Sequence, residues 1–235
     1  MAEQEIIDHT KKAYKVWHSK EHSFWHKLKE FMLEIVIIVF AVTVSIWLHN
    51  WSEHHHEQEQ VKDFLVDVKE DLQKDIEIIK QVHGNLTGAI EHFVELQNLT
   101  PARIDSFAKV HQSIQLNTDR IFREAFQANY EGFKSSGKIA LIENKKLKKE
   151  LLEYNQETLQ NLKEQENAYN DQMVKTTDYA TENIEKSDKD LLLNPRFKVI
   201  LRINLQWGTR LEKQYTEALD KANELLSEIS REVKE

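Results

Sequence analysis

The sequence predicts an all-α protein: one N-terminal transmembrane helix that continues into a helical stalk, followed by an exported bundle of long antiparallel helices. The 235 residues include only five Gly and two Pro, whereas these two residue types make up about 12% of an average protein. Sandwiches, barrels and doubly wound nucleotide-binding folds need more turns and are disfavoured. Charged residues make up 31% of the chain, as in long helices and coiled coils. The absence of Cys excludes disulfides and thiol chemistry.

The transmembrane helix is predicted from an apolar run over residues 31–48 that contains one charge, Glu34. With three further residues the run is about 20 residues long, enough to cross a bilayer. Trp25, Trp47 and Trp51 flank it like an interfacial aromatic belt. A buried core helix fits less well because the run is apolar on every face. A cleaved signal peptide fits less well because thirty residues precede the run and bulky residues follow it.

The distribution of Lys predicts the orientation of this helix. Residues 11–30 contain six Lys, whereas residues 49–68 contain only Lys62. Positive charge stays on the cytoplasmic side, so the N-terminus should be cytoplasmic and the C-terminal body exported. The predicted domains are a cytoplasmic amphipathic juxtamembrane segment over 1–30, the transmembrane helix over 31–51, and the exported helical bundle over 52–235.

The stalk is predicted from apolar residues that keep helical spacing after Trp51. Gly84 and Gly88 are expected to bend or break it, with a short helix continuing to about Asn98. Capping signals place the remaining helices. These helices should begin at Thr100-Pro101, near Thr118 or Asp119 (ending by 132–137), after Asn144 (145–186), and at Asn194-Pro195.

The last helix carries an apolar seam with alternating spacings of four and three, as in a coiled coil. Either the helix over 145–186 or a second subunit must cover this seam. The helix over 145–186 looks too polar to do so alone, because Thr158, Gln165 and Thr176 occupy inward positions. We therefore expect a homo-oligomer formed through the stalk or the seam, whose residues are Leu211, Tyr215, Ala218, Ala222, Leu225 and Ile229.

Two stretches carry a resemblance to a known family. Glu34-Ile35 opens the apolar run, Asn50-Trp51 closes it, and residues 137–144 read Gly-Lys-Ile-Ala-Leu-Ile-Glu-Asn. Together they resemble an uncharacterised Bacteroidota family of single-span membrane proteins, a domain of unknown function. The resemblance implies a Gram-negative inner membrane and a periplasmic location for the exported part. It implies no activity, ligand or catalytic residue. The His-rich run over 54–56 departs from the family pattern.

Two His clusters are candidates for metal binding. His18, His22 and His26 recur every four residues and would share one helical face, a spacing that suits zinc or nickel. The alternative, amphipathic side chains at a membrane surface, is favoured because no nearby acid completes a second shell. Residues 53–57 read Glu-His-His-His-Glu. Di-iron chemistry would need a second Glu-x-x-His motif, so surface His near the lipid headgroups is favoured, with adventitious metal binding as the alternative.

Two charged features have a structural and a functional interpretation. Glu34 lies about one turn inside the apolar run, where local snorkelling or protonation of its carboxyl is favoured over an ion-handling or inter-subunit role. Lys145, Lys146, Lys148 and Lys149 form the strongest basic run. A solvated face that pairs with acidic neighbours is favoured there over a phosphate site.

The sequence contains no Gly-rich phosphate loop, nucleophile elbow or His-Glu-x-x-His motif. No catalysis and no cofactor are therefore expected, and the net charge of −8 disfavours nucleic acid as a partner. The leading hypothesis is a membrane-anchored structural or protein-interaction module that contacts the lipid bilayer and binds a protein partner or a second copy. The alternatives are a ligand sensor and an oligomeric channel subunit.

Overall fold

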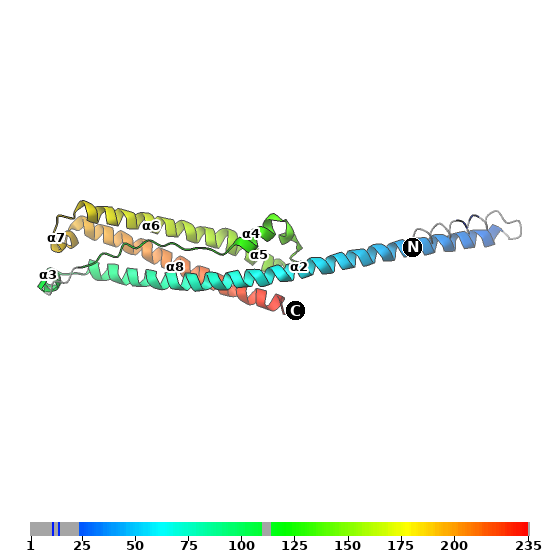
Figure 1. Cartoon of the computed structure of the whole chain (residues 1–235), viewed down its shortest axis with the longest axis horizontal. Coiled ribbons are helices and arrows are strands. Elements are labelled where there is room, and N and C mark those ends of the chain that lie inside the picture. The colour runs from blue at the N-terminus through cyan, green and yellow to red at the C-terminus, as the bar shows by residue number, and fades with distance from the viewer. Residues whose placement is uncertain (1–10, 12–13, 15–23, 110–113, 235) are drawn as a thin grey trace. The chain divides into compact units, whose positions relative to one another are not determined.

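The structure is a computed structural model that describes residues 11, 14, 24–109 and 114–234. The chain divides into two compact units, 1–59 and 60–235. Helices account for all regular structure in the described part of the chain, which contains no strand (Figure 1). The all-α prediction is therefore confirmed.

The first unit contains the apolar part of α2, the helix Phe24–Gln97. Its most apolar 18 residues have a mean hydropathy of 2.5, and none of them is buried. Trp25, Trp47 and Trp51 are exposed, whereas Glu34 is half-buried. By length and composition, α2 is the one helix among the described residues that could cross a membrane.

Helix α2 continues through Gly84 and Gly88, so a break at these residues, one of the two expectations, is wrong. A Gly inside a helix costs only about 1 kcal/mol relative to Ala. Leu86, Ala89 and Phe93 lie on the buried face of the same stretch. Burial of a large apolar side chain stabilises by about 1.5–3 kcal/mol, so core packing outweighs the two glycines.

The second unit begins with the rest of α2, and the expected capping signals define its later helices. Asn144 accepts a hydrogen bond from the Leu147 N–H (3.1 Å) and Asn194 accepts one from the Arg196 N–H (2.9 Å). The elements are α3 (Pro101–Lys109), α4 (Ala128–Ser135), the 3₁₀ turn η1 (Lys138–Leu141), α5 (Lys145–Glu153), the π-helical turn η2 (Tyr154–Thr158), α6 (Leu159–Glu182), α7 (Asp188–Leu192) and α8 (Pro195–Glu232).

Two apolar clusters form the core of this unit and show how its long helices run. One cluster joins residues 79–96 of α2 to residues 162–179 of α6. The other joins residues 61–76 of α2 to residues 147–159, which belong to α5, η2 and the start of α6. Residue numbers rise in the same direction along both partners, so α2 and α5–α6 are parallel.

Helix α8 runs antiparallel to both of these helices. Its residues 197–218 belong to the first cluster and its residues 222–229 to the second, the reverse of the order in α2 and α6. The predicted antiparallel arrangement is therefore found for α8, whereas α2 and α6 form a parallel pair. Figure 1 shows α6, α8 and the later part of α2 side by side.

The parallel pair explains why the helix expected from Thr118 or Asp119 does not form. Residues 60–97 of α2 span about 55 Å, and the chain must return over this length before α5 begins. Eighteen residues separate α3 from α4, and they reach about 60 Å when extended. Residues 114–127, the extended segment, contain no helix. Topology overrides a local helical preference here, and only α4 remains of the predicted helix.

The α8 seam belongs to the intramolecular core. Its six side chains are at most 1% exposed within a single chain. They are covered by α2, α5, η2 and α6. Thr158 and Thr176 are also buried, as expected for polar residues at inward positions. The seam therefore offers no apolar surface to a second copy, and its burial gives no support to an oligomer formed through it.

Close packing between α2 and α8 generates the first prediction. A Cβ added at Gly208 would lie 2.9 Å from Cγ1 of Ile90, whereas one added at Gly88 meets nothing within 4 Å. Both glycines lie inside helices. Gly88→Ala should stabilise the protein by about 0.5–1 kcal/mol, and Gly208→Ala should destabilise it by about 1–3 kcal/mol.

The measurement is urea unfolding of the full chain in detergent, followed by circular dichroism. The two variants add the same methyl group to the same type of element, so each serves as the control for the other. Equal changes in the free energy of unfolding would contradict the close approach of α2 and α8 at Gly208.

Candidate functional site

The extended segment is attached to α6 by a side chain that replaces a neighbouring strand. The Ile121 N–H donates to Oδ1 of Asn170, and Nδ2 of Asn170 donates to the Ile121 carbonyl, both at 2.7 Å. Backbone groups of a segment without a strand partner still require hydrogen bonds where they are buried. One amide side chain on α6 provides both bonds at this residue.

A buried ionic group holds the segment two residues further on. Arg123 Nε donates to Oε1 of Glu166 at 2.8 Å, with 2% and 6% of the two side chains exposed. The hydroxyl of Tyr215 donates to the same oxygen at 2.7 Å. Burial and the negative charge of Glu166 raise the pKa of Tyr215, so the hydroxyl stays protonated and can donate. The group joins the segment to α6 and α8.

A third attachment joins the segment to α2. The Phe126 N–H donates to Oδ1 of Asp75 at 3.0 Å. Burial raises the pKa of Asp75 to about 6, although this hydrogen bond and the charge of Arg123 act in the opposite direction. Asp75 also lines a small cavity beside the π-helical turn, where the buried hydroxyl of Tyr154 has no hydrogen-bond partner among the described residues.

These attachments leave one edge of the segment open. In an extended chain, the N–H and C=O groups of successive residues point to opposite sides. Ile121 faces α6 and Phe126, five residues on, faces α2, so Phe122 and Glu124 direct their backbone groups toward α2. Their N–H and C=O groups have no hydrogen-bond partner among the described residues.

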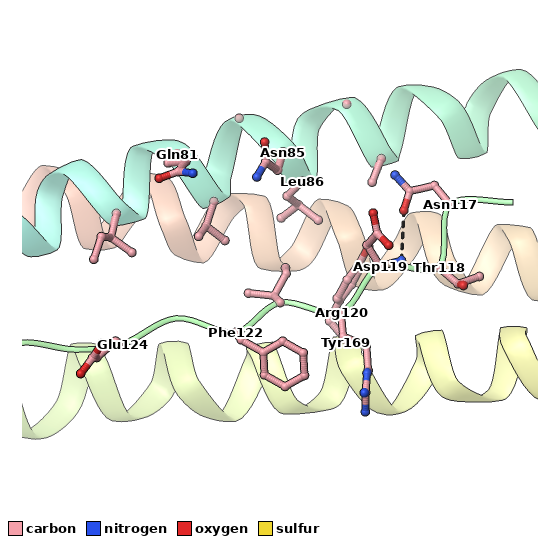
Figure 2. Close-up of a pocket in the computed structure, with 16 residues that line it drawn as sticks. Gln81, Asn85, Leu86, Asn117, Thr118, Asp119, Arg120, Phe122, Glu124 and Tyr169 are labelled. Carbon is pink, nitrogen blue, oxygen red and sulfur yellow. Dashed lines mark hydrogen bonds between the residues drawn. The ribbon is translucent and has the colours of Figure 1, made fainter. Parts of the chain in front are cut away.

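A groove lies between this open edge and α2. It has a volume of about 1130 Å³. Figure 2 shows Gln81 and Asn85 on α2, across the groove from Phe122 and Glu124 on the extended segment. The buried side chains of Leu86 and Tyr169 contribute apolar surface to it. The other residues that line it are Ile78, Val82, Gly84, Gly88, Ala89, Asn117, Thr118, Asp119, Arg120 and Ile121.

The aromatic ring beside this groove is largely exposed. Phe122 has 76% of its surface exposed, and the guanidinium of Arg120 lies 5.2 Å from its ring centroid. The groove thus combines an open backbone edge, side-chain amides and an exposed aromatic ring. These groups suit the binding of another molecule by hydrogen bonding and apolar contact.

The predicted metal-binding residues are not brought together within the described residues. His18 and His22 lie outside the described part of the chain, as does the side chain of His26. The run 53–57 is helical, and its His55 lies 3.6 Å from Glu59. No group of three His, Asp or Glu residues that could hold a metal occurs in the part of the chain that the structure describes.

The basic run pairs with acidic neighbours, as predicted. Lys146 Nζ lies 2.8 Å from Oε1 of Glu228 on α8, and Lys149 Nζ lies 3.3 Å from Oε1 of Glu153. The hydrogen bond to Glu228 raises the pKa of Lys146. The run thus contributes to the contact between α5 and α8.

The groove and its supporting charges were not identified from the sequence. One signal was present: Glu166 continues the inward spacing of Leu162, Tyr169 and Met173, and a charge at a core position requires a buried partner. The partner, Arg123, lies 43 residues away in the chain. Nothing local indicates this pairing.

The buried ion pair generates the second prediction. Arg123→Met removes the charge but keeps much of the volume, and it leaves the Glu166 carboxylate buried with only Tyr215 as a donor. The free energy of unfolding should fall by about 3–5 kcal/mol. Arg123→Met combined with Glu166→Gln removes both charges and should recover most of that loss.

Denaturant unfolding of the full chain in detergent measures both variants. The control is Lys213→Met, which removes the cation of an exposed pair with Glu217 and should change stability by at most about 1 kcal/mol. A double variant at least as unstable as Arg123→Met alone would contradict a coupled pair.

Comparison with known proteins assigns the chain to a family. No curated protein and no solved structure matches it. One family model matches residues 34–178, more than half of the chain. The match extends from the apolar stretch of α2 through the extended segment and most of α6, and so includes every residue that lines the groove. The chain belongs to this family, the family of unknown function DUF6090.

Proposed function

We propose that this protein is a membrane-anchored protein-interaction module that acts by binding and not by catalysis. The observation that carries the proposal is the exposed ring of Phe122 beside the groove. Aromatic side chains are enriched at the energetic centres of protein interfaces. The buried charges of Arg123 and Glu166 hold the segment that presents this ring.

The proposed location is the inner membrane, with residues 1–30 in the cytoplasm, residues 31–51 as a single span and residues 52–235 in the periplasm. The exposed apolar stretch of α2 supports the span. The Lys balance around the span supports the orientation. The resemblance to single-span Bacteroidota proteins supports a Gram-negative inner membrane.

The groove also favours a second candidate function, that of a ligand sensor, because a sensor needs a concave site between its helices. A channel receives less support. The hydroxyls of Thr43 and Ser45 donate to the carbonyls of Val39 and Ala41 in their own helix, at 2.7 and 2.8 Å. Their hydrogen-bonding capacity is therefore partly used within α2, which weakens a polar channel lining.

Reporter fusions test the proposed location. Alkaline phosphatase is active in the periplasm and green fluorescent protein fluoresces in the cytoplasm, so a fusion after Glu30 should fluoresce and a fusion after Glu70 should show phosphatase activity. The physical reason is the excess of Lys before the span. The reverse pattern would contradict both the orientation and a periplasmic partner.

Photocrosslinking in cells tests the interaction. A photoreactive phenylalanine analogue at Phe122 should yield a crosslinked species of higher mass, because the ring would be buried in the complex. The matched control is Ile184, which has the same exposed fraction of 76% and does not line the groove. A species of twice the chain mass would identify a second copy as the partner. Absence of any protein crosslink at Phe122 would contradict the proposed function and favour the sensor.

A further inference from the structure

We propose that the groove between α2 and the extended segment binds an extended stretch of partner polypeptide that carries Lys or Arg, by hydrogen bonding to its backbone. This inference rests on the proposed function and specifies the chemistry of the partner.

The extended segment has one edge of backbone groups that is open toward the groove. The backbone groups of Phe122 and Glu124 face α2 and lack partners among the described residues. An exposed row of N–H and C=O groups is a template for the addition of another strand. Since these groups border the groove, a polypeptide lying in it would be in register to pair with them.

The opposite wall of the groove, on α2, carries two side-chain amides. Gln81 and Asn85 lie one turn apart on α2 and are exposed, and their side chains make no hydrogen bond to other described residues. On the other side of the segment, Asn170 shows what an amide on a helix does in this molecule, because it binds both the N–H and the C=O of Ile121. An amide offers one acceptor and two donors, so Asn85 can bind a second extended backbone in the same way.

The groove has room for a polypeptide backbone beside α2. Gly84 and Gly88 line the groove on α2, and a Cβ at either position would meet nothing within 4 Å. Their lack of side chains lets a polypeptide backbone approach the helix. Residues 117–124 would measure about 26 Å if fully extended, which matches a bound segment of about seven or eight residues.

The charged side chains near the groove indicate the sign of the charge that the partner should carry. The lining includes the carboxylates of Asp119 and Glu124, whereas the guanidinium of Arg120 stacks on Phe122. Residues 60–235 carry 26 Lys and Arg against 31 Asp and Glu. Complementary charge raises association rates and suppresses partners of the wrong sign. A segment with Lys or Arg fits this environment better than one with Asp or Glu.

A peptide selection tests the inference without assuming a sequence. The full chain in lipid nanodiscs is used to select from a displayed library of random heptapeptides, with counter-selection on the Gly88→Phe variant, whose side chain would project into the groove. The selected peptides should contain Lys or Arg. One of them, labelled with fluorescein, then serves as the probe in fluorescence anisotropy.

Three changes should each weaken binding of this probe by about tenfold, the cost of one or two hydrogen bonds or of the lost space. They are N-methylation of alternate peptide amides, Asn85→Leu, and Gly88→Phe. The matched controls are Asn161→Leu and Gln73→Phe, exposed positions on α6 and α2 that do not line the groove. These controls should change affinity by less than about twofold. Circular dichroism checks that each variant retains its helices.

Failure of this inference can be told apart from failure of the proposed function. If no peptide is selected, or if N-methylation leaves affinity unchanged, the backbone-binding groove is overturned. Selection of acidic peptides overturns the charge assignment. If Phe122 still crosslinks to a protein in cells under these outcomes, the interaction module stands and its partner is not bound as an extended strand. If the backbone-binding test fails and Phe122 also forms no crosslink to a protein, both proposals are overturned.

Discussion

The second unit depends on one constraint: a chain that joins two parallel helices must cross the full length of the bundle. Helices α2 and α6 share both apolar clusters in the same order, so their connection cannot be a short turn. An extended crossing has no sheet to complete its hydrogen bonds, and buried backbone groups without partners are costly. Side chains of the flanking helices provide them instead. Asn170 pairs with Ile121, and Asp75 accepts from Phe126.

The same constraint explains why charges occur in an otherwise apolar core. Arg123 points inward because residues 121–124 of the segment alternate between half-buried and exposed positions. Its guanidinium then requires the carboxylate of Glu166, and that carboxylate also accepts from Tyr215. Hydrophobic residues of similar volume often stabilise a core at least as well as a buried ion pair. What the pair adds is position, because its geometry links the segment, α6 and α8 at one place.

Local sequence features predicted the helices well, and features that depend on distant residues were missed. The caps at Asn144 and Asn194 act within three residues, so their signals can be read directly from the sequence. The apolar seam of α8 was also visible in the sequence, but the polar residues along 145–186 gave no sign that α2 would help to cover it within one chain. The clusters show α2 covering the seam together with α5, η2 and α6. The bonds that hold the extended segment join residues 43–51 positions apart, and no periodicity encodes them.

The groove follows from this architecture without any residue dedicated to forming it. A segment attached to α6 through Ile121 directs its alternate backbone groups away from α6. The backbone groups of Phe122 and Glu124 have no partner on α2. Gly84 and Gly88 present no side chain on the part of α2 that lines the groove. The two glycines weaken the helix by about 1 kcal/mol each, and neither is needed for close packing inside the unit. Gly208, by contrast, lies where a Cβ would meet Ile90. Glycines that serve packing and glycines that leave a surface open can thus be distinguished by what surrounds them, and the second kind lies along the groove.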